Sequence, residues 1–166
     1  MSPYSYISAA PIFLADKTSG LNQETINAIN EGNFKKVLIV GGSAVVPDSV
    51  MDQLALSNEN IERLSGENRY QTSIAIAEHS IKNTELAHNN AVFATGANFP
   101  DALAGGAFAA AKKTVLILVE DSADGREAID SFVKKYSAEI GKGYLLGGTS
   151  AIPNNLAGDI EAASKN

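Results

Sequence analysis

The chain contains two copies of one sequence pattern, separated by slightly more than a hundred residues. Residues 37–43 combine an apolar run with Gly-Gly-Ser, and residues 143–149 combine a similar run with Gly-Gly-Thr, 106 positions later. An upstream apolar run at 11–15 matches residues 115–119 at an offset of 104, so the copies differ by a short insertion. The segment 61–108 has no full earlier counterpart. One and a half copies of a module are typical of stacking or attachment devices, which seldom carry a catalytic centre in every copy.

Composition and net charge limit the kinds of function that the chain can have. With 166 residues, 45% hydrophobic and 19% charged, the chain can bury a core and form one or two small domains. Its net charge of −6 argues against nucleic acid and against simple electrostatic adsorption. Cysteine is absent, which excludes disulfides and thiol chemistry. The sequence contains no signal peptide and no run of about 18 apolar residues, so we expect no membrane span. If the protein is exported, we expect this chain to be a fragment that lacks the signal peptide.

Short apolar runs alternate with helical patterns along the chain. The runs fit strands buried on both faces of a parallel sheet and occupy residues 12–15, 37–40, 91–94, 115–119 and 144–146. Residues 61–64 alternate in polarity and predict an edge strand. Apolar stripes at helical spacing occupy residues 70–81 and 129–136. We therefore predict an α/β fold with right-handed crossovers and a mainly parallel sheet covered on both faces, a Rossmann-like arrangement.

Local signals add detail to this fold. Asn22 and Asn68 are expected to cap helices, the latter with Gln71 at the third helical position as in a capping box. At the centres of the strands we expect nearly complete burial of three residues: Val92, Leu118 and Leu146. Truncation of any of them to Ala would then cost about 2–5 kcal/mol.

Two turns are candidate anion sites. They follow predicted strands at the carboxyl edge of the sheet, and they consist of Gly41, Gly42 and Ser43 in the first copy and Gly147, Gly148 and Thr149 in the second. A tight turn that needs positive φ is the structural alternative, and the glycines favour it over binding. Neither turn forms a dinucleotide fingerprint or a P-loop, so nucleotide binding has little support. A small α/β nucleotide- or phosphate-binding enzyme domain that uses these turns is the alternative interpretation.

Four further residues are candidates for binding. Arg69 lies in the first turn of a predicted helix, where a cation opposes the helix dipole, so a specific partner is indicated. Its forked guanidinium suits phosphate or carboxylate, and an ion pair with an Asp of a neighbouring module is the structural alternative. Tyr70 begins the apolar stripe and favours the core. Asn98 is positioned to cap the next helix, and Asp101 lies in its first turn, where it could hold a sugar hydroxyl or an Arg of another module.

Catalytic patterns are absent from the sequence. The two histidines, His79 and His88, have no Glu at metal spacing, and we expect both to be solvated surface residues. Asp121 and Asp124 lack the spacing with which Toprim enzymes hold magnesium. The sequence therefore predicts neither an enzyme nor a metal or cofactor site.

Three ordered motifs carry a resemblance to a known family. Residues 61–72, residues 94–104 and the Gly147-Gly148 turn resemble the type 2 cell-wall-binding repeat of Gram-positive surface proteins. The resemblance covers residues 61–163 fully and 2–56 as a partial module. It implies a Toprim-like α/β fold, usually in three tandem copies, that holds a protein non-covalently on an anionic, teichoic-acid-like wall polymer. The attached effector in this family is commonly an amidase, a protease, an adhesin or a surface-layer subunit.

These observations predict a particular organisation. Residues 1–56 would form the C-terminal half of a wall-binding module and residues 57–166 a complete one. The resemblance implies a non-catalytic, extracellular anchor whose polymer-binding residues come from the candidates above, with no nucleic acid or membrane partner. Because the first module lacks its first strand and helix, we expect an uncovered face, and hence either self-association, with a trimer favoured, or a merger of both pieces into one continuous sheet.

Overall fold

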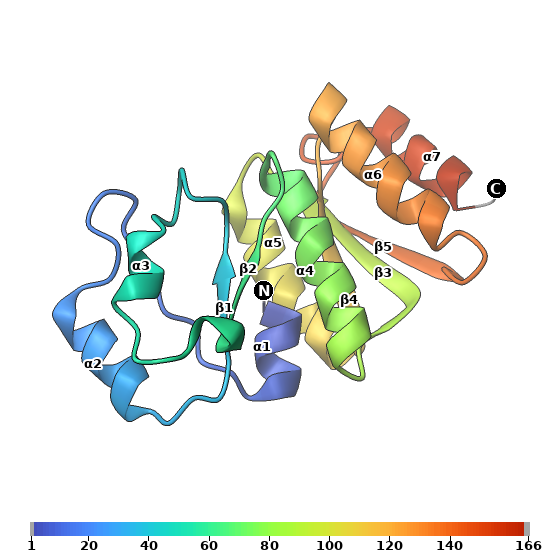
Figure 1. Ribbon diagram of the computed structural model, residues 1–166. Helices are drawn as coiled ribbons and strands as arrows, with labels where there is room; N and C mark the ends of the chain where they lie inside the picture. Colours follow the sequence, from blue (N-terminus) through green and yellow to red (C-terminus); the bar gives the residue numbers. More distant parts are fainter. Residues whose placement is uncertain (1, 165–166) are drawn as a thin grey trace.

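The computed structural model describes residues 2–164 as alternating helices and parallel strands (Figure 1). The helices are α1 (Ser2–Ser8), α2 (Gln23–Glu31), α3 (Ser49–Asp52), α4 (Arg69–Asn83), α5 (Phe99–Ala111), α6 (Ala123–Lys135) and α7 (Asn154–Ala163), with a short 3-10 turn, η1, at Asn58–Asn60. The strands are β1 (Val37–Val40), β2 (Ile61–Leu64), β3 (Ala87–Thr95), β4 (Thr114–Val119) and β5 (Lys142–Leu146). They form two sheets, β1-β2 and β4-β3-β5, and all pairs are parallel.

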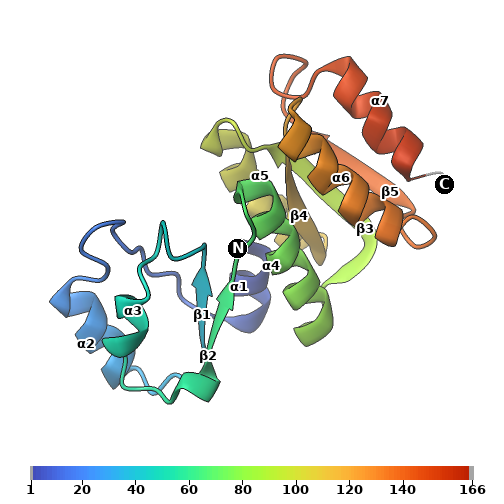
Figure 2. The same ribbon diagram turned by 45° about the horizontal axis from the view of Figure 1, so that its top comes forward.

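The three-stranded sheet is covered on both faces. Helices α4 and α6 pack on one face, with α7 against α6, and α5 packs on the other face with α1 beside it (Figures 1 and 2). Neighbouring residues of β3 point to opposite faces, so Phe93 joins the main core with Phe132 and Ile129, whereas Val92 lies on the side of α5. The predicted α/β class with parallel strands and two covered faces is confirmed for this sheet.

Burial in this sheet depends on the position of the strand and on the face to which the side chain points. The central strand is β3, and Val92 is completely buried, as predicted. The predictions of nearly full burial for Leu118 and Leu146 are wrong, because both side chains are half-buried. Both residues lie on edge strands, β4 and β5, and on the face that α5 covers, where Leu146 lies beside Gly105. Ile117, on the other face of β4, is fully buried in the main core.

The two-stranded sheet has its own small core. In its register Val37 lies opposite Ile61 and Val40 opposite Leu64. Ile39 and Ile61 are buried together with Leu21, Ile29, Val50 and Leu54. This cluster is separate from the main core of the three-stranded sheet.

The strand predicted at residues 12–15 is absent, and that prediction is wrong. These residues have no regular secondary structure, and Ile12, Phe13 and Leu14 are exposed. The counterpart of this segment in the second copy is β4, whose only neighbour is β3. No strand equivalent to β3 is described beside residues 12–15, so their backbone has no ladder to join.

The sequence repeat is visible in the backbone. Ala9, just after α1, has a φ of 50°, and Lys113, its counterpart 104 residues later just after α5, has a φ of 51°. Gly41 and Gly147, 106 residues apart, have φ of 114° and 123°. The two copies therefore share these turn conformations, although residues 12–15 form no strand where their counterpart forms β4.

The expected merger into one continuous sheet is wrong for residues 2–164, which contain two separate sheets. The connection runs through β2 and α4, since β2 pairs with β1 of the first sheet and α4 packs on β4 of the second. The division at residue 56 stays a proposal, and the β1-β2 pair crosses it.

Side chains hold the predicted helix starts. Asn22 accepts a hydrogen bond from the Thr25 amide at 2.8 Å, and Asn68 accepts from the amides of Tyr70 and Gln71 at 3.0 and 2.9 Å. Both N-caps are therefore confirmed. Within residues 2–164, no helix combines the length and the apolar character needed to cross a membrane.

Candidate functional site

The candidate site lies at the carboxyl edge of the three-stranded sheet. Its strands end at Thr95, Val119 and Leu146, and the chain continues into Gly96, Glu120 and Gly147. Because all three strands are parallel, these three turns meet at one edge. In open α/β sheets this edge is where ligands bind.

Arg69 reaches this edge from the first turn of α4. Its Nη1 donates to the carbonyl oxygen of Gly96 at 2.7 Å, and the residue is otherwise exposed. No other hydrogen-bond partner and no carboxylate partner of this guanidinium lies among residues 2–164. One arm of the fork is thus anchored, and the remaining donors face solvent.

Tyr70 is a structural part of the same edge. Its ring is buried, and its hydroxyl donates a hydrogen bond to the Glu120 carboxylate. Burial, followed by that carboxylate, raises the pKa of Tyr70 to about 12. A Cβ at Gly96 would lie 2.4 Å from the Tyr70 ring, so the ring fits only against a glycine. Tyr70 belongs to the core, as the apolar stripe predicts, and fixes the turn that receives Arg69.

Asn98 and Asp101 lie at the start of α5. Asn98 occupies the cap position with extended backbone, but its side chain makes no cap hydrogen bond, so the predicted cap is wrong. The Asn98 side chain is exposed and available to a ligand. Asp101 is half-buried, and a Cβ built on Gly147 would lie 2.9 Å from its Oδ2. The structure therefore brings Asp101 and Gly147 together.

The two Gly-Gly turns have the same conformation on different sheets. In the first, the amides of Val45 and Val46 donate to Gly42 O at 3.0 Å. In the second, Gly148 O accepts in the same way from Ala151 and Ile152. The positive φ of each leading glycine is accounted for by this turn. Gly42 and Gly148 have open space where a Cβ would be, which leaves room beside both loops.

Arg63 holds the first of these turns, a role that sequence reasoning missed. It projects from β2, and its Nη1 donates to the carbonyl oxygens of Gly41 and Val46 at 2.7 and 3.0 Å. Its Nη2 donates to Asp48 at 2.8 Å, and the side chain is largely covered. The alternating pattern at 61–64 predicts an edge strand but does not say which turn its arginine reaches. The Gly41–Ser43 candidates therefore lie at the end of the two-stranded sheet and not with Arg69.

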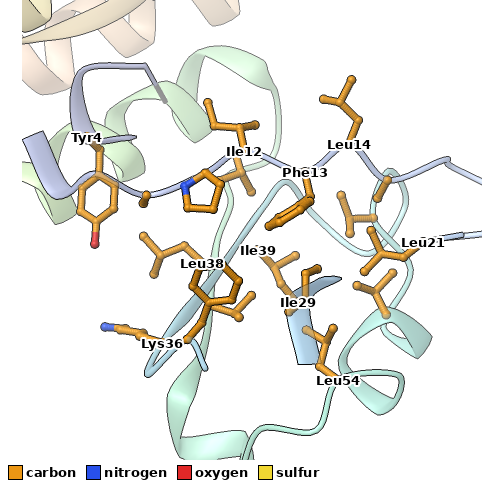
Figure 3. A pocket seen from close by; sticks show the side chains of 18 residues that line it. Tyr4, Ile12, Phe13, Leu14, Leu21, Ile29, Lys36, Leu38, Ile39 and Leu54 are labelled. Carbon is orange, nitrogen blue, oxygen red and sulfur yellow. The ribbon is translucent and has the colours of Figure 1, made fainter. Parts of the chain in front are cut away.

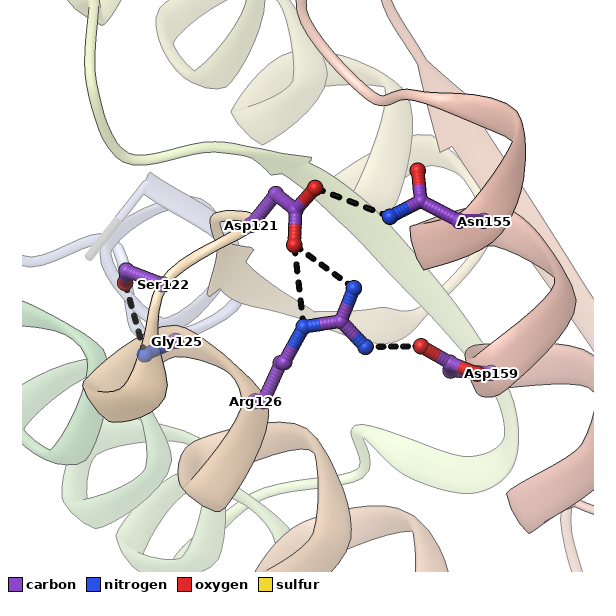
Figure 4. A network of polar contacts seen from close by, with 6 residues as sticks. All are labelled: Asp121, Ser122, Gly125, Arg126, Asn155 and Asp159. Carbon is purple, nitrogen blue, oxygen red and sulfur yellow. Dashed lines mark hydrogen bonds and ion pairs between the residues drawn. The ribbon is translucent and has the colours of Figure 1, made fainter.

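A polar network locks α6 to α7 near the same edge (Figure 4). Arg126 donates to Asp121 from Nε at 2.9 Å and from Nη2 at 2.6 Å, and it also pairs with Asp159. Asn155 donates to the other oxygen of Asp121 at 2.9 Å. The Asn155 amide, followed by Arg126, lowers the pKa of Asp121. Because Arg126 is engaged by two carboxylates, Arg69 is the more available cation for a ligand.

The histidines serve the packing of the molecule. His79 is buried, with Nδ1 3.0 Å from Glu62 and its ring 5.4 Å from that of Tyr4, so its predicted surface position is wrong. The face of α4 that carries it lies in the joint between the two sheets. His88 lies in β3, half-buried, and pairs with Glu139. No group of three or more metal-ligating side chains comes together in the described part of the chain.

Comparison with known proteins identifies an amidase and an amidase enhancer as relatives. Two proteins of Bacillus subtilis (strain 168) match nearly the whole chain. N-acetylmuramoyl-L-alanine amidase LytC is 27% identical over 161 residues, which are 96% of this chain and 30% of that protein. An amidase enhancer is 26% identical over 167 residues, which are 98% of this chain and 21% of that protein. The chain thus spans less than a third of either relative.

Solved structures show the same fold. Cwp6 from Clostridium difficile superposes with a TM-score of 0.79 at 21% identity, covering 98% of this chain and 25% of that one. Cwp8 from the same organism gives a TM-score of 0.68 at 22% identity, covering 98% of this chain and 26% of that one.

The family model described as cell wall binding domain 2 matches residues 63–157, more than half of the chain. The matched segment begins at Arg63 and includes Arg69, Asp101 and the second Gly-Gly turn. The chain therefore belongs to the cell wall binding domain 2 family.

Proposed function

We propose that the chain is a non-catalytic anchoring module that binds an anionic, teichoic-acid-like polysaccharide of a Gram-positive cell wall, outside the cell. Membership of a wall-binding family supports the attachment role. The relatives are an amidase and an amidase enhancer, of which this chain corresponds to under a third. A segment that makes up less than a third of its relatives fits a module that holds a separate effector, such as an amidase, on the wall.

The observation that carries the proposal is the placement of Arg69. A helix N-terminus disfavours a cation, yet Arg69 is held there by a 2.7 Å hydrogen bond to Gly96 O and keeps the rest of its fork exposed. A guanidinium orients two donors toward one phosphate or carboxylate group. We assign to Arg69 the charged contact with the polymer.

The surroundings of Arg69 define the remaining contacts. Carboxylates crowd this edge of the sheet, at Asp101, Glu120 and Asp121, and they disfavour further anionic groups of a ligand. They suit sugar hydroxyls instead, as does the exposed amide of Asn98. In our proposal Arg69 binds an anionic group, while Asn98, Asp101 and the amides of Gly147, Gly148 and Thr149 contact the sugar. Gly41, Gly42 and Ser43 form the equivalent contact of the first module, and Tyr70 supports the site from below.

A module that contacts the polymer through one guanidinium should bind it weakly. Several modules on one polymer chain would combine their weak sites through high effective concentration. We therefore propose that the modules associate, with a trimer favoured. Phe99 and Leu103 support this, since they lie one turn apart on α5 with 77% and 66% of their surface exposed. They present an apolar strip next to Asn98 that a neighbouring module would cover.

Cosedimentation with purified walls tests the role of Arg69. Arg69→Ala should reduce the bound fraction several-fold, because it removes the charged fork, and the melting temperature should stay nearly unchanged. Lys82→Ala is the matched control, since it removes the same charge from the last turn of the same helix. If Arg69→Ala bound walls as well as Lys82→Ala, the polymer-binding surface would lie elsewhere.

A further inference from the structure

An apolar groove opens between residues 11–15 and strand β1 (Figure 3). One wall carries Ile12, Phe13 and Leu14, which are 51%, 39% and 88% exposed. The opposite wall and the floor are formed by Leu38 and Ile29. Three large exposed apolar side chains in succession beside such a groove mark a binding surface.

The internal repeat identifies what such a groove would hold. By offset, residues 11–15 are the counterpart of β4, and β1 is the counterpart of β5. Helices α2 and α6 also end 104 residues apart, at Glu31 and Lys135. In the complete copy, β3 lies between β4 and β5 and pairs with both. Among residues 2–164, no strand occupies the corresponding position between residues 11–15 and β1.

We propose that this groove is the docking site for a β-strand of the β3 type, supplied by another module of the same kind. The strand would enter parallel to β1 and would complete a sheet in the order 11–15, inserted strand, β1, β2. This inference concerns the assembly of modules and does not depend on which polymer the chain binds.

The backbone of β1 supports a strand as the occupant. Within the described chain β1 pairs only with β2, so its alternate amides and carbonyls on the other side point toward the groove without a ladder partner. Addition of a strand to an exposed edge supplies these hydrogen bonds, and side-chain pockets add specificity. A small apolar ligand would fill the groove but leave the edge of β1 unpaired.

The side chains of β3 fit the two faces of the groove. In the complete copy, Phe93 packs toward α6 in a cluster that includes Val133, and Val92 faces α5. The counterpart of Val133 in the first copy is Ile29 of α2, which lines the groove. An inserted strand would place its Phe over Ile29 and its Val on the side of α1, the counterpart of the end of α5. The same insertion would give residues 12–15 the neighbour that a strand at this position requires.

A peptide in trans gives the first test. The probe is a synthetic peptide with the sequence of residues 89–97, added to the full chain. We expect saturable binding, at least a ten-fold slowing of amide exchange in β1 and residues 12–15, and a loss of fluorescence from an apolar dye bound to the groove. The matched control is the same peptide with Phe93→Asp, which should produce none of these changes because it would bury a charge.

A covalent version keeps the proposal testable where the free peptide is too weak. Residues 57–105 are joined directly ahead of Ser2, because residue 106 is the counterpart of residue 2 at the offset of 104. The extended chain should melt at a higher temperature and protect the β1 amides. Val92→Pro in the added copy alone should abolish both effects, because proline cannot donate within a central strand.

Two results would overturn the proposal. One is exchange in β1 that remains as fast with the extension as without it. The other is an unmodified chain that dimerises in light scattering with the groove already protected, which would make a second copy, held without strand exchange, the occupant.

Discussion

Arg63 shows how one side chain of β2 secures the first Gly-Gly turn. It satisfies the carbonyls of Gly41 and Val46 and pairs with Asp48 from a largely covered position. Arg63→Ala would leave two carbonyls without their donor, so we expect a loss of about 1–3 kcal/mol in the free energy of unfolding. Arg63→Lys keeps the charge but not the fork, and it should lose part of that amount. Urea denaturation measures both, and a loss for Arg63→Ala no larger than for Lys82→Ala would contradict this role.

Ionisation of Tyr70 makes the folded state less stable at alkaline pH. Its pKa rises from an ordinary value of 10.0 to about 12 on folding, so the folded state favours the neutral phenol. The resulting stabilisation is complete below about pH 10 and is lost as pH rises through about 12. An ultraviolet difference titration should show one tyrosine ionising late, and Tyr70→Phe should remove that phase. Ionisation of every tyrosine near pH 10 in the folded protein would be inconsistent with the buried hydrogen bond to Glu120.

At the residue scale, the sequence predicts single positions better than their partners. The place of Arg69 in a first helical turn, and the positive φ of Gly41 and Gly147, follow from local signals. The acceptor of Arg69, Gly96, lies 27 residues away, and the acceptor of Tyr70, Glu120, lies 50 residues away. Such contacts depend on strand order, which local patterns do not specify.

At the scale of elements, α7 packs against α6 and completes the main core. Leu156 of α7 is completely buried in that core. Leu156→Ala should cost about 2–5 kcal/mol, because it removes apolar contacts and leaves a cavity. Leu103→Ala makes the same chemical change at an exposed site on α5 and should alter stability by less than about 0.5 kcal/mol. Thermal unfolding of a dilute sample compares the two, and equal losses would show that α7 does not form part of the core.

The elements also show where sequence patterns fail. The runs at 91–94 and 115–119 form paired strands in which Phe93 lies opposite Ile117, as their apolar character predicts. The run at 12–15 is equally apolar, yet it forms no strand. Strand formation needs a hydrogen-bonding neighbour as well as an apolar sequence, and the neighbour is a property of the surrounding chain. The burial of His79 likewise depends on the surrounding chain, because β2 and α1 pack against this residue.

At the scale of the whole molecule, exposed apolar surface and net charge act in opposite directions. The charge of −6 opposes association, whereas the strip formed by Phe99 and Leu103 favours it. We expect sedimentation velocity to show a concentration-dependent assembly, with a trimer as the limiting species. Phe99→Ser together with Leu103→Ser should shift the distribution toward the monomer without a loss of helix content. A strict monomer at all concentrations would contradict the association that we propose.

The central claim is that the chain attaches to a cell-wall polymer without doing chemistry. The direct measurement is cosedimentation of the purified chain with walls that retain their secondary anionic polymer and with walls from which that polymer has been extracted. We expect retention on the intact walls, release as salt is raised, and little retention on the extracted walls. Equal retention on both kinds of wall, or cleavage of either by the chain, would contradict it.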